Sequence, residues 1–205
     1  MPSMSSVEQA FCRSAPWRAF TRRVLLPWVL QGVPLDGDVL EIGAGSGAMA
    51  AGLMDAAPNL RMTVTDYDDA MVAATQRLLV TAGKHAAVRR ADATALPFVD
   101  DSFDIVLSVL MLHHVVDWER ALAEAARVLR PGGVLVGADL LGTLPARLLH
   151  RLEGARYRMV TRRELRGTLE ALPFRDVVIT PDPTRLAARF TAHKTDALDR
   201  AVGAA

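Results

Sequence analysis

Short apolar runs alternate with amphipathic segments through the first two thirds of the 205-residue chain. The runs stop at glycine or acidic residues, which is typical of buried strands. The segments between them repeat apolar positions every three or four residues, which predicts helices packed on a sheet. We expect strands over 39–43, 61–66, 86–92, 102–110 and 134–141, and the main helices between them over 46–57, 68–83 and 118–130.

After residue 141 this alternation loosens. Residues 143–172 predict one or two basic helices, and two strand-like runs follow over 174–180 and 185–193. Two strands with a short connection form an antiparallel pair. Strands alternating with helices form a parallel sheet covered on both faces. We therefore predict an α/β protein with a Rossmann-like, doubly wound sheet.

The first 34 residues precede the alternating pattern. Apolar residues recur at helical spacing over 7–31, where Pro16 can open a helix and Pro27 should kink or end it. We expect residues 1–34 to be a helical cover segment and 35–205 to be a single domain. Within that domain, 143–172 would be a helical insertion or lid.

The stretch VLEIGAGSGAMA places Gly43, Gly45 and Gly47 between a strand and a helix. Glycines let the backbone turn sharply and let a ligand approach the peptide N–H groups at a helix start. The spacing is G-x-G-x-G, but because Ala48 follows, it is also a permitted variant of the dinucleotide fingerprint. The loop predicts a nucleotide-like cofactor without saying which.

Asp66 ends the next strand, about 20 residues beyond the glycines. A carboxylate there can accept hydrogen bonds from both hydroxyls of a ribose. The alternative is a helix cap, a role for which Asp68 and Asp69 are already available. Nicotinamide and adenosyl cofactors both carry such a ribose, so these two classes stay open at this point.

Two later stretches distinguish between the nicotinamide and adenosyl classes of cofactor. They are RRADATALPFVDDSFDIVLSVLMLHHV and ALAEAARVLRPGGVLV. In order and spacing, they and the glycine loop resemble the class I S-adenosylmethionine-dependent methyltransferases, in the small-molecule subgroup that includes quinone-biosynthesis enzymes. The resemblance runs from about Val39 to Leu141, with a looser match through the terminal strand pair. It implies a seven-stranded sheet whose last strand is antiparallel. It also implies S-adenosylmethionine as cofactor and S-adenosylhomocysteine as product.

The resemblance also implies roles for residues at matching positions. Glu41 would help to orient the methionine end of the cofactor, above a loop formed by Gly43, Ala44, Gly45 and Gly47.

The remaining implied positions follow the second, third and fourth strands. Asp66 would hold the ribose, and Tyr67 would flank the adenine. Asp92 would accept a hydrogen bond from the adenine amino group, and the Ala93 N–H would donate to a ring nitrogen. The backbone carbonyl of Ser108 would meet the amino group of the cofactor.

A general base is needed only if the methyl acceptor must lose a proton. His113 and His114 follow the fourth strand and are the candidates, with His113 slightly favoured. The alternative is that they pack a helix start or line the pocket. The chain lacks the N/D-P-P-Y/F run of enzymes that methylate amino groups, so an oxygen or carbon acceptor is favoured over nitrogen.

Two sets of side chains bear on the acceptor. An apolar pocket could be lined by Trp17, Phe20, Trp28, Met111, Leu144, Leu148 and Met159, although core packing is the alternative for each. A basic cluster comprises Arg147, Arg151, Arg156, Arg158, Arg162, Arg163 and Arg166. Such a cluster is usually a solvated face, but it could attract an anionic substrate or give peripheral contact with a membrane surface. Together the two sets suit a small, lipid-like or aromatic acceptor.

Composition narrows the remaining classes. The net charge of +1 and the lack of a recognisable motif argue against a nucleic acid partner. The histidines and Cys12 form no metal-binding pattern, so no metal is expected. The N-terminal stretch does not read as a secretory signal and no apolar run is long enough to span a bilayer, so we expect a cytoplasmic protein.

Two further functions remain as alternatives to methyl transfer. A regulatory protein could bind S-adenosylmethionine without turnover. An NAD(P)-dependent oxidoreductase fits the loop, but the segment from Asp92 to Gly133 does not support it.

Overall fold

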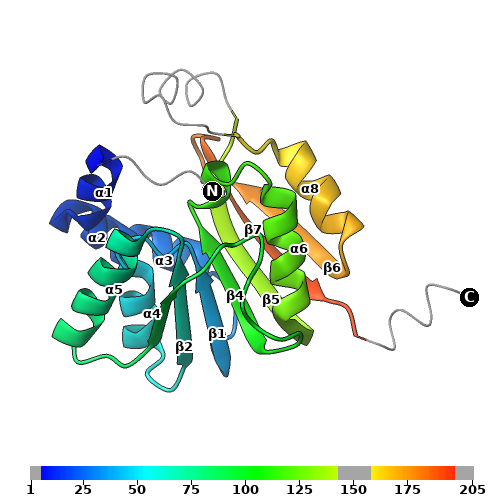
Figure 1. Ribbon diagram of the computed structural model, residues 1–205. Helices are drawn as coiled ribbons and strands as arrows, with labels where there is room; N and C mark the ends of the chain where they lie inside the picture. Colours follow the sequence, from blue (N-terminus) through cyan, green and yellow to red (C-terminus); the bar gives the residue numbers. More distant parts are fainter. Residues whose placement is uncertain (1–5, 143–157, 197–205) are drawn as a thin grey trace, which may run out of the picture.

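The computed structural model describes residues 6–142 and 158–196, which form one seven-stranded sheet with helices around it (Figure 1). The strand order is β3-β2-β1-β4-β5-β7-β6. The strands are β1 (Asp38–Ile42), β2 (Arg61–Asp66), β3 (Ala87–Arg90), β4 (Phe103–Val109), β5 (Leu129–Leu140), β6 (Phe174–Pro181) and β7 (Ala187–Lys194).

Strands β1 to β5 pair in parallel, whereas β7 pairs antiparallel with both β5 and β6. This confirms the predicted Rossmann-like sheet with an antiparallel last strand. The chain runs directly from β6 into β7 through a turn around Asp182, whose carboxylate accepts backbone N–H groups from Thr184 and Ala187.

Helices cover both faces of the sheet, as predicted (Figure 1). One apolar cluster packs α3 (Leu26–Val29), α4 (Ala48–Ala56) and α5 (Asp69–Thr81) on the sheet. The opposite cluster packs α6 (Trp118–Val128) and α8 (Arg162–Ala171) on it. Side chains of β1 alternate between the two: Val39 joins the first cluster, and Leu40 and Ile42 join the second. Glu41 therefore lies on the face that α4 covers.

The expected helix over 7–31 is divided into pieces. They are α1 (Ser6–Arg13), α2 (Ala15–Phe20), a π-helical turn η1 (Thr21–Leu25) and α3. The Ser14 hydroxyl accepts the Trp17 N–H and caps α2. Pro27 lies in the first turn of α3, where its missing N–H is tolerated, and the π-helical turn precedes it. Pro27 thus marks a change of helix type rather than a helix end.

The start of β5 differs from the expectation. The helix predicted over 118–130 ends at Val128, and the strand predicted from 134 begins at Leu129. Leu129 pairs with Phe103 and Val134 with Ile105, so an irregularity in the pairing accommodates the Arg-Pro-Gly-Gly stretch between them. A proline that cannot donate a ladder hydrogen bond fits such an irregular stretch.

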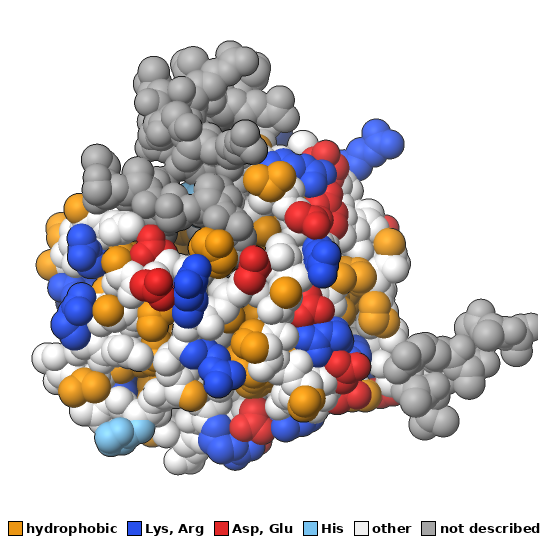
Figure 2. Space-filling view, in the orientation of Figure 1, with side chains coloured by type: hydrophobic (Ala, Val, Ile, Leu, Met, Phe, Trp, Pro, Cys, Tyr) orange, Lys and Arg blue, Asp and Glu red, His pale blue; other side chains and the backbone are white. Residues whose placement is uncertain are grey.

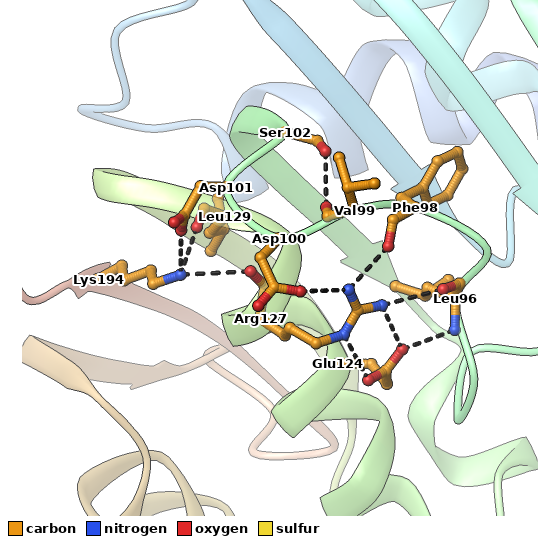
Figure 3. A network of polar contacts seen from close by, with 10 residues as sticks. All are labelled: Leu96, Phe98, Val99, Asp100, Asp101, Ser102, Glu124, Arg127, Leu129 and Lys194. Carbon is orange, nitrogen blue, oxygen red and sulfur yellow. Dashed lines mark hydrogen bonds and ion pairs between the residues drawn. The ribbon is translucent and has the colours of Figure 1, made fainter.

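A polar network ties α6 to the start of β4 and the end of β7 (Figure 3). The Arg127 guanidinium donates to the carboxylates of Glu124 and Asp100 and to the backbone carbonyls of Phe98 and Leu96. The hydrogen bond to Glu124, and to a smaller extent the one to Asp100, raises the pKa of Arg127. This network lies where the parallel strands begin, at the edge of the sheet opposite their carboxyl ends.

Lys194 belongs to the same network and is almost fully buried. Its ammonium group donates to the Asp101 carboxylate at 2.7 Å and to the backbone carbonyls of Leu129 at 2.6 Å and Arg127 at 3.3 Å. The buried charge is therefore paired and hydrogen-bonded, as such a position requires.

The predicted insertion over 143–172 is only partly described. Its described part contains α8, which begins with a capping box formed by Thr161 and Glu164. Arg147, Arg151, Arg156, Leu144 and Leu148 lie outside the described residues. Among the residues that are described, no helix is long and apolar enough to cross a membrane.

Candidate cofactor-binding site

A pocket opens where β1, β2 and β4 reach their carboxyl ends, below the N-terminal helices. This edge is where open α/β sheets bind their ligands. Of the residues predicted from the sequence, its lining includes Glu41, Gly43, Ala44, Gly45, Asp66, Tyr67, Ala93 and His114. Gly47, Asp92, Ser108 and His113 lie nearby but outside the lining.

The glycine loop bends through left-handed backbone conformations that favour glycine. Gly43 has φ +69°, and a Cβ there would lie 2.1 Å from Cγ of Met111, so the loop approaches the segment after β4 closely. Gly45 has φ +57° and open space beside it, on the side of the pocket. Gly47, at φ +77°, caps α4 and packs against Thr75.

Asp66 is buried at the end of β2, and its carboxylate organises the loop. Oδ2 accepts the Gly45 N–H at 2.8 Å, and Oδ1 accepts the Asp68 N–H at 2.9 Å. Burial raises the pKa of Asp66, although these N–H donors act in the opposite direction. Each oxygen keeps a lone pair that a ligand hydroxyl could use.

Glu41 brings a carboxyl oxygen without a described partner to the pocket wall. It is almost fully buried, and its Oε2 has no hydrogen-bond partner among the described residues. Burial is the main cause that raises the pKa of Glu41 to about 8, and repulsion from Asp66 adds to it. A buried polar atom without a partner is rare, and a carboxyl oxygen facing a pocket fits a cationic or hydrogen-bond-donating ligand.

The far side of the pocket is formed after β2 and β3. The Arg90 guanidinium lies 5.0 Å from the centre of the Tyr67 ring, and its Nε donates to the Tyr67 carbonyl. Asp92 accepts hydrogen bonds from the Thr94 hydroxyl and N–H at 2.7 and 2.8 Å. Burial acts to raise the pKa of Asp92, but these two bonds outweigh it and lower the pKa.

The segment after β4 forms the wall opposite the glycine loop. Ser108 is buried, and its hydroxyl has no partner among the described residues. Leu110 lines the pocket with φ +52°, a conformation that is strained for a bulky residue. Its N–H donates to the Ala138 carbonyl at 2.7 Å, which holds that conformation against β5.

The two histidines have different surroundings. His114 lines the pocket, whereas His113 is buried with Nδ1 2.6 Å from Oδ1 of Asp139 at the end of β5. Asp139 Oδ2 also accepts the N–H groups of Met111 and Leu112. This carboxylate therefore fixes the 3₁₀ turn η2 (Leu112–His114) that positions His114. Nothing in the sequence near Asp139 signals this contact, so the residue could not be identified as part of the site beforehand.

The N-terminal helices close the pocket from above. The Ser46 hydroxyl donates to the Cys12 carbonyl at 2.6 Å, and Gln9 Nε2 donates to the Asp68 carboxylate at 2.8 Å. Thr21 and Leu25 of η1 also line the pocket. The sequence did not single out these contacts of the N-terminal segment, which involve Gln9, Cys12, Thr21 and Leu25.

Only some of the apolar residues predicted to line the acceptor pocket do so in the structure. Trp17 and Met111 line the pocket, Phe20 is exposed, and Trp28 packs beside the core. Met159 lies outside the pocket lining. In the part of the chain that is described, no three His, Cys, Asp or Glu side chains gather in a way that could hold a metal ion.

Comparison with known proteins agrees with this geometry. Residues 40–137 match the family of methyltransferase domains. Over 119 residues the chain is 40% identical to the ubiquinone/menaquinone biosynthesis C-methyltransferase UbiE of Paracoccus denitrificans, covering 56% of this chain and 46% of that protein. Over 102 residues it is 40% identical to phthiotriol/phenolphthiotriol dimycocerosates methyltransferase 1 of Mycobacterium ulcerans, covering 50% of this chain and 37% of that protein.

The fold has solved counterparts. The crystal structure of a SAM-dependent methyltransferase from Aquifex aeolicus superposes with a TM-score of 0.74 at 17% identity, covering 93% of this chain and 99% of that one. Residues 40–137 thus resemble a methyltransferase domain, and the described residues share the fold of a solved SAM-dependent methyltransferase. Its sequence relatives include ubiquinone/menaquinone and demethylmenaquinone methyltransferases, which supports the resemblance to the quinone-biosynthesis subgroup. The chain spans about half the length of the curated relatives it matches.

Proposed function

We propose that this protein transfers a methyl group from S-adenosylmethionine to a small, apolar acceptor. The observation that carries the proposal is the pair of buried carboxyl groups on the pocket wall. Glu41 presents an oxygen without a partner, and Asp66 is held by two backbone N–H groups with lone pairs to spare. One cationic amino group and one ribose diol would satisfy these oxygens.

S-adenosylmethionine, when bound, supplies a methyl group already activated on a sulfonium. This chain's residues have the tasks of binding, orienting and excluding water. Glu41 would accept a hydrogen bond from the methionine amino group and Asp66 from the ribose hydroxyls. Tyr67 would flank the adenine, and the Ala93 N–H would donate to a ring nitrogen. Gly43, Ala44 and Gly45 would lie under the methionine portion.

Asp92, Ser108 and Gly47 have supporting roles in this proposal. Asp92 lies one residue before Ala93 and would accept a hydrogen bond from the adenine amino group at Oδ2, because both bonds from Thr94 go to Oδ1. Ser108 would offer its backbone carbonyl, and Gly47 would keep the start of α4 close to the ligand.

His114 is the better candidate for a general base, because its ring lines the pocket. The ring of His113 lies 4.1 Å away, centre to centre, and its Nδ1 is engaged by Asp139. His113 would therefore position the turn and support its neighbour. This assignment reverses the order that the sequence favoured and remains a proposal.

The acceptor would be an apolar or aromatic molecule methylated on carbon or oxygen. Trp17, Leu25, Leu110 and Met111 give the pocket an apolar portion beside His114. The relatives' names, which include a quinone-biosynthesis C-methyltransferase and a methyltransferase of phthiotriol dimycocerosates, support a lipid-like molecule. We also propose a cytoplasmic location, with which the single cysteine is consistent.

Thermal unfolding with separate additions of S-adenosylmethionine, S-adenosylhomocysteine, NAD and NADP tests the cofactor. A ligand at about 100 times its dissociation constant should add about 2.7 kcal/mol to the free energy of unfolding. We expect a shift with the two adenosyl ligands only, and none for Asp66→Ala. Asp69→Ala, which changes an exposed carboxylate three residues away, is the matched control. A shift with NAD or NADP alone would exclude the proposal.

The acceptor is tested by incubating the protein with methyl-labelled S-adenosylmethionine and a panel of demethylated quinones, phenols and hydroxylated lipids. We expect label in an apolar member of the panel, on carbon or oxygen. If ligand binding is intact but no member is labelled while small polar amines are, the apolar-acceptor part of the proposal is wrong.

A further inference from the structure

The N-terminal helices carry apolar side chains on both of their faces. On the inner face, Leu25 is buried and lines the pocket, and Leu26 is buried beside it. On the outer face, Phe11, Phe20 and Val24 are 56%, 44% and 53% exposed. A surface helix normally presents polar residues outward, so large apolar side chains clustered on the outer face indicate a contact with something else.

The exposed aromatic residues form a continuous group. The rings of Phe11 and Trp17 are 4.8 Å apart, and those of Trp17 and Phe20 are 5.5 Å apart, centre to centre. Trp17 also lines the pocket. One row of rings therefore runs from the outer face of the cover to the proposed methyl-transfer site.

A basic cleft lies beside these rings. Arg13 of α1, Arg18 of α2 and Arg77 of α5 line it together with Ser46 and Thr81. Arg18 and Arg77 form no ion pair with any side chain that the structure describes, and Arg13 donates to the Gln9 carbonyl. Figure 2 shows basic and hydrophobic side chains side by side at the left edge of the molecule, where Figure 1 draws α2 and α5.

We infer that this outer cover surface, formed by Phe11, Phe20, Val24, Arg13, Arg18 and Arg77, binds an anionic lipid bilayer. Aromatic and aliphatic side chains next to arginines are the composition of helices that lie in a membrane interface. The three arginines attract anionic headgroups, and the three apolar residues enter the boundary of the acyl chains. The occupant is a lipid surface rather than a protein, because arginines that pair with no described carboxylate lie beside apolar side chains, a combination that complements anionic headgroups and acyl chains together.

Membrane binding goes beyond the proposed function, but its biological role rests on that function, the methylation of an apolar acceptor. A lipid-like acceptor dissolves in the bilayer, and the cover would place the row of rings at the point where such a molecule leaves it. The basic region from Arg158 through α8 is a weaker candidate for the same role. Arg158 pairs with Glu119 and Arg166 with Glu170, so part of its charge is already compensated.

Flotation with lipid vesicles tests the inference. One set contains phosphatidylcholine alone, and the other contains about one third phosphatidylglycerol. We expect the protein to float with the anionic vesicles and to remain behind with the neutral ones. Arg18→Glu/Arg77→Glu should weaken binding about tenfold or more, because each charge near an anionic surface contributes to affinity. Phe11→Ser/Phe20→Ser should weaken it comparably.

Matched controls separate the surface from general charge and hydrophobicity. Arg166→Glu/Arg175→Glu makes the same change in net charge elsewhere, and Val99→Ser/Val178→Ser removes two other exposed apolar residues. Both should float like the unaltered protein. Equal loss in the charge control would overturn the inference, as would flotation on neutral vesicles alone.

Two further outcomes would also overturn it. Inorganic phosphate at low concentration could abolish flotation without an equal effect from sodium chloride of the same ionic strength, which would indicate a phosphate site rather than a lipid surface. Self-association that is lost in Phe11→Ser/Phe20→Ser, without flotation, would indicate a second copy as the occupant. The S-adenosylhomocysteine thermal shift, measured on each variant, reports folding and the proposed function independently of flotation.

Discussion

Glu41 is a carboxyl group whose ionisation should depend on whether a ligand lies beside it. With no partner for Oε2, burial and Asp66 hold its pKa at about 8, so it is mostly protonated at neutral pH. A cationic amino group nearby would favour the ionised form. We therefore expect the binding of S-adenosylhomocysteine at pH 7 to release a proton and to tighten as the pH rises from about 6 to about 8.

Calorimetry in buffers of different ionisation enthalpy measures this proton release. Glu41→Gln keeps the shape of the side chain and removes the titration. We expect weaker binding in that variant and no proton release from this position. Proton release that is unchanged in Glu41→Gln would assign it to another group.

The two histidines should separate by what their substitution changes. His114→Gln should lower kcat by about 10² to 10⁴ while leaving S-adenosylhomocysteine binding and stability nearly unchanged, because a base acts only in the chemical step. His113→Gln should lower the free energy of unfolding by about 1–3 kcal/mol, because it weakens a buried hydrogen bond to Asp139. Methylation rates and denaturant unfolding of both variants check this. If His113→Gln instead lowers kcat at unchanged stability, while His114→Gln leaves kcat unchanged, then His113 is the base.

At the scale of elements, Lys194 of β7 connects that strand to α6, to the start of β5 and to the segment before β4, far from the pocket (Figure 3). Lys194→Met keeps most of the side-chain volume but leaves two buried carbonyls without this donor. We expect a loss of about 1–3 kcal/mol in the free energy of unfolding, with cofactor binding unchanged. Urea unfolding followed by circular dichroism measures the loss.

Lys84→Met is the matched control for that experiment. Lys84 pairs with the half-exposed carboxylate of Asp55 at 2.6 Å. Because its carboxylate is 44% exposed, this pair should contribute only about 1 kcal/mol. Equal losses in the two variants would mean that burial of Lys194 adds nothing beyond an ordinary ion pair.

Interactions within an element, or between neighbouring ones, could be predicted from the sequence. Asp68 was a candidate cap for the helix that follows it, and it accepts the Ala70 N–H there. Asp66 lies at the strand end that the glycine spacing indicated, and it lines the pocket. In both cases the residue and its partner are close in sequence or belong to a well-defined motif.

Contacts between distant segments could not be predicted in this way. Gln9 and Asp68 are 59 residues apart, and His113 and Asp139 are 26 apart. Their pairing depends on the sheet order and on where the N-terminal helices lie. The early start of β5 was missed for a related reason, because the Arg-Pro-Gly-Gly stretch looks like a loop until its neighbour β4 is known.

For the whole molecule, carboxyl groups with opposite pKa shifts should produce a stability maximum. The pKa values of Asp38 and Glu124 are lowered, chiefly by hydrogen bonds from Arg61 and Arg127. Their contribution is present above about pH 4 and is lost as the pH falls through the lowered values. The pKa values of Glu41 and Asp66 are raised, mainly by burial. Below about pH 4 both groups are protonated in the folded and unfolded states, so they do not lower the stability of the fold. As the pH rises further the unfolded chain loses these protons first, and for Glu41 this lowers the free energy of unfolding up to about pH 8.

We therefore expect the ligand-free protein to be most stable at about pH 5 and to lose stability steadily towards about pH 8. Thermal unfolding across this range, at constant ionic strength, measures the profile. Glu41→Gln should flatten the side above pH 5. A stability maximum at or above pH 8 in the unaltered protein would contradict the raised pKa values of these two buried groups.

The position of β7 determines when the sheet can be completed as the chain is synthesised. Although β7 follows β6 in the chain, it lies between β5 and β6 in the sheet (Figure 1). Until residues 187–194 leave the ribosome, the backbone of β5 along Val134, Val136 and Ala138 has no partner on that side. A nascent chain would thus expose an apolar strand edge for the time taken to translate about 50 further residues, a feature that favours association with other chains.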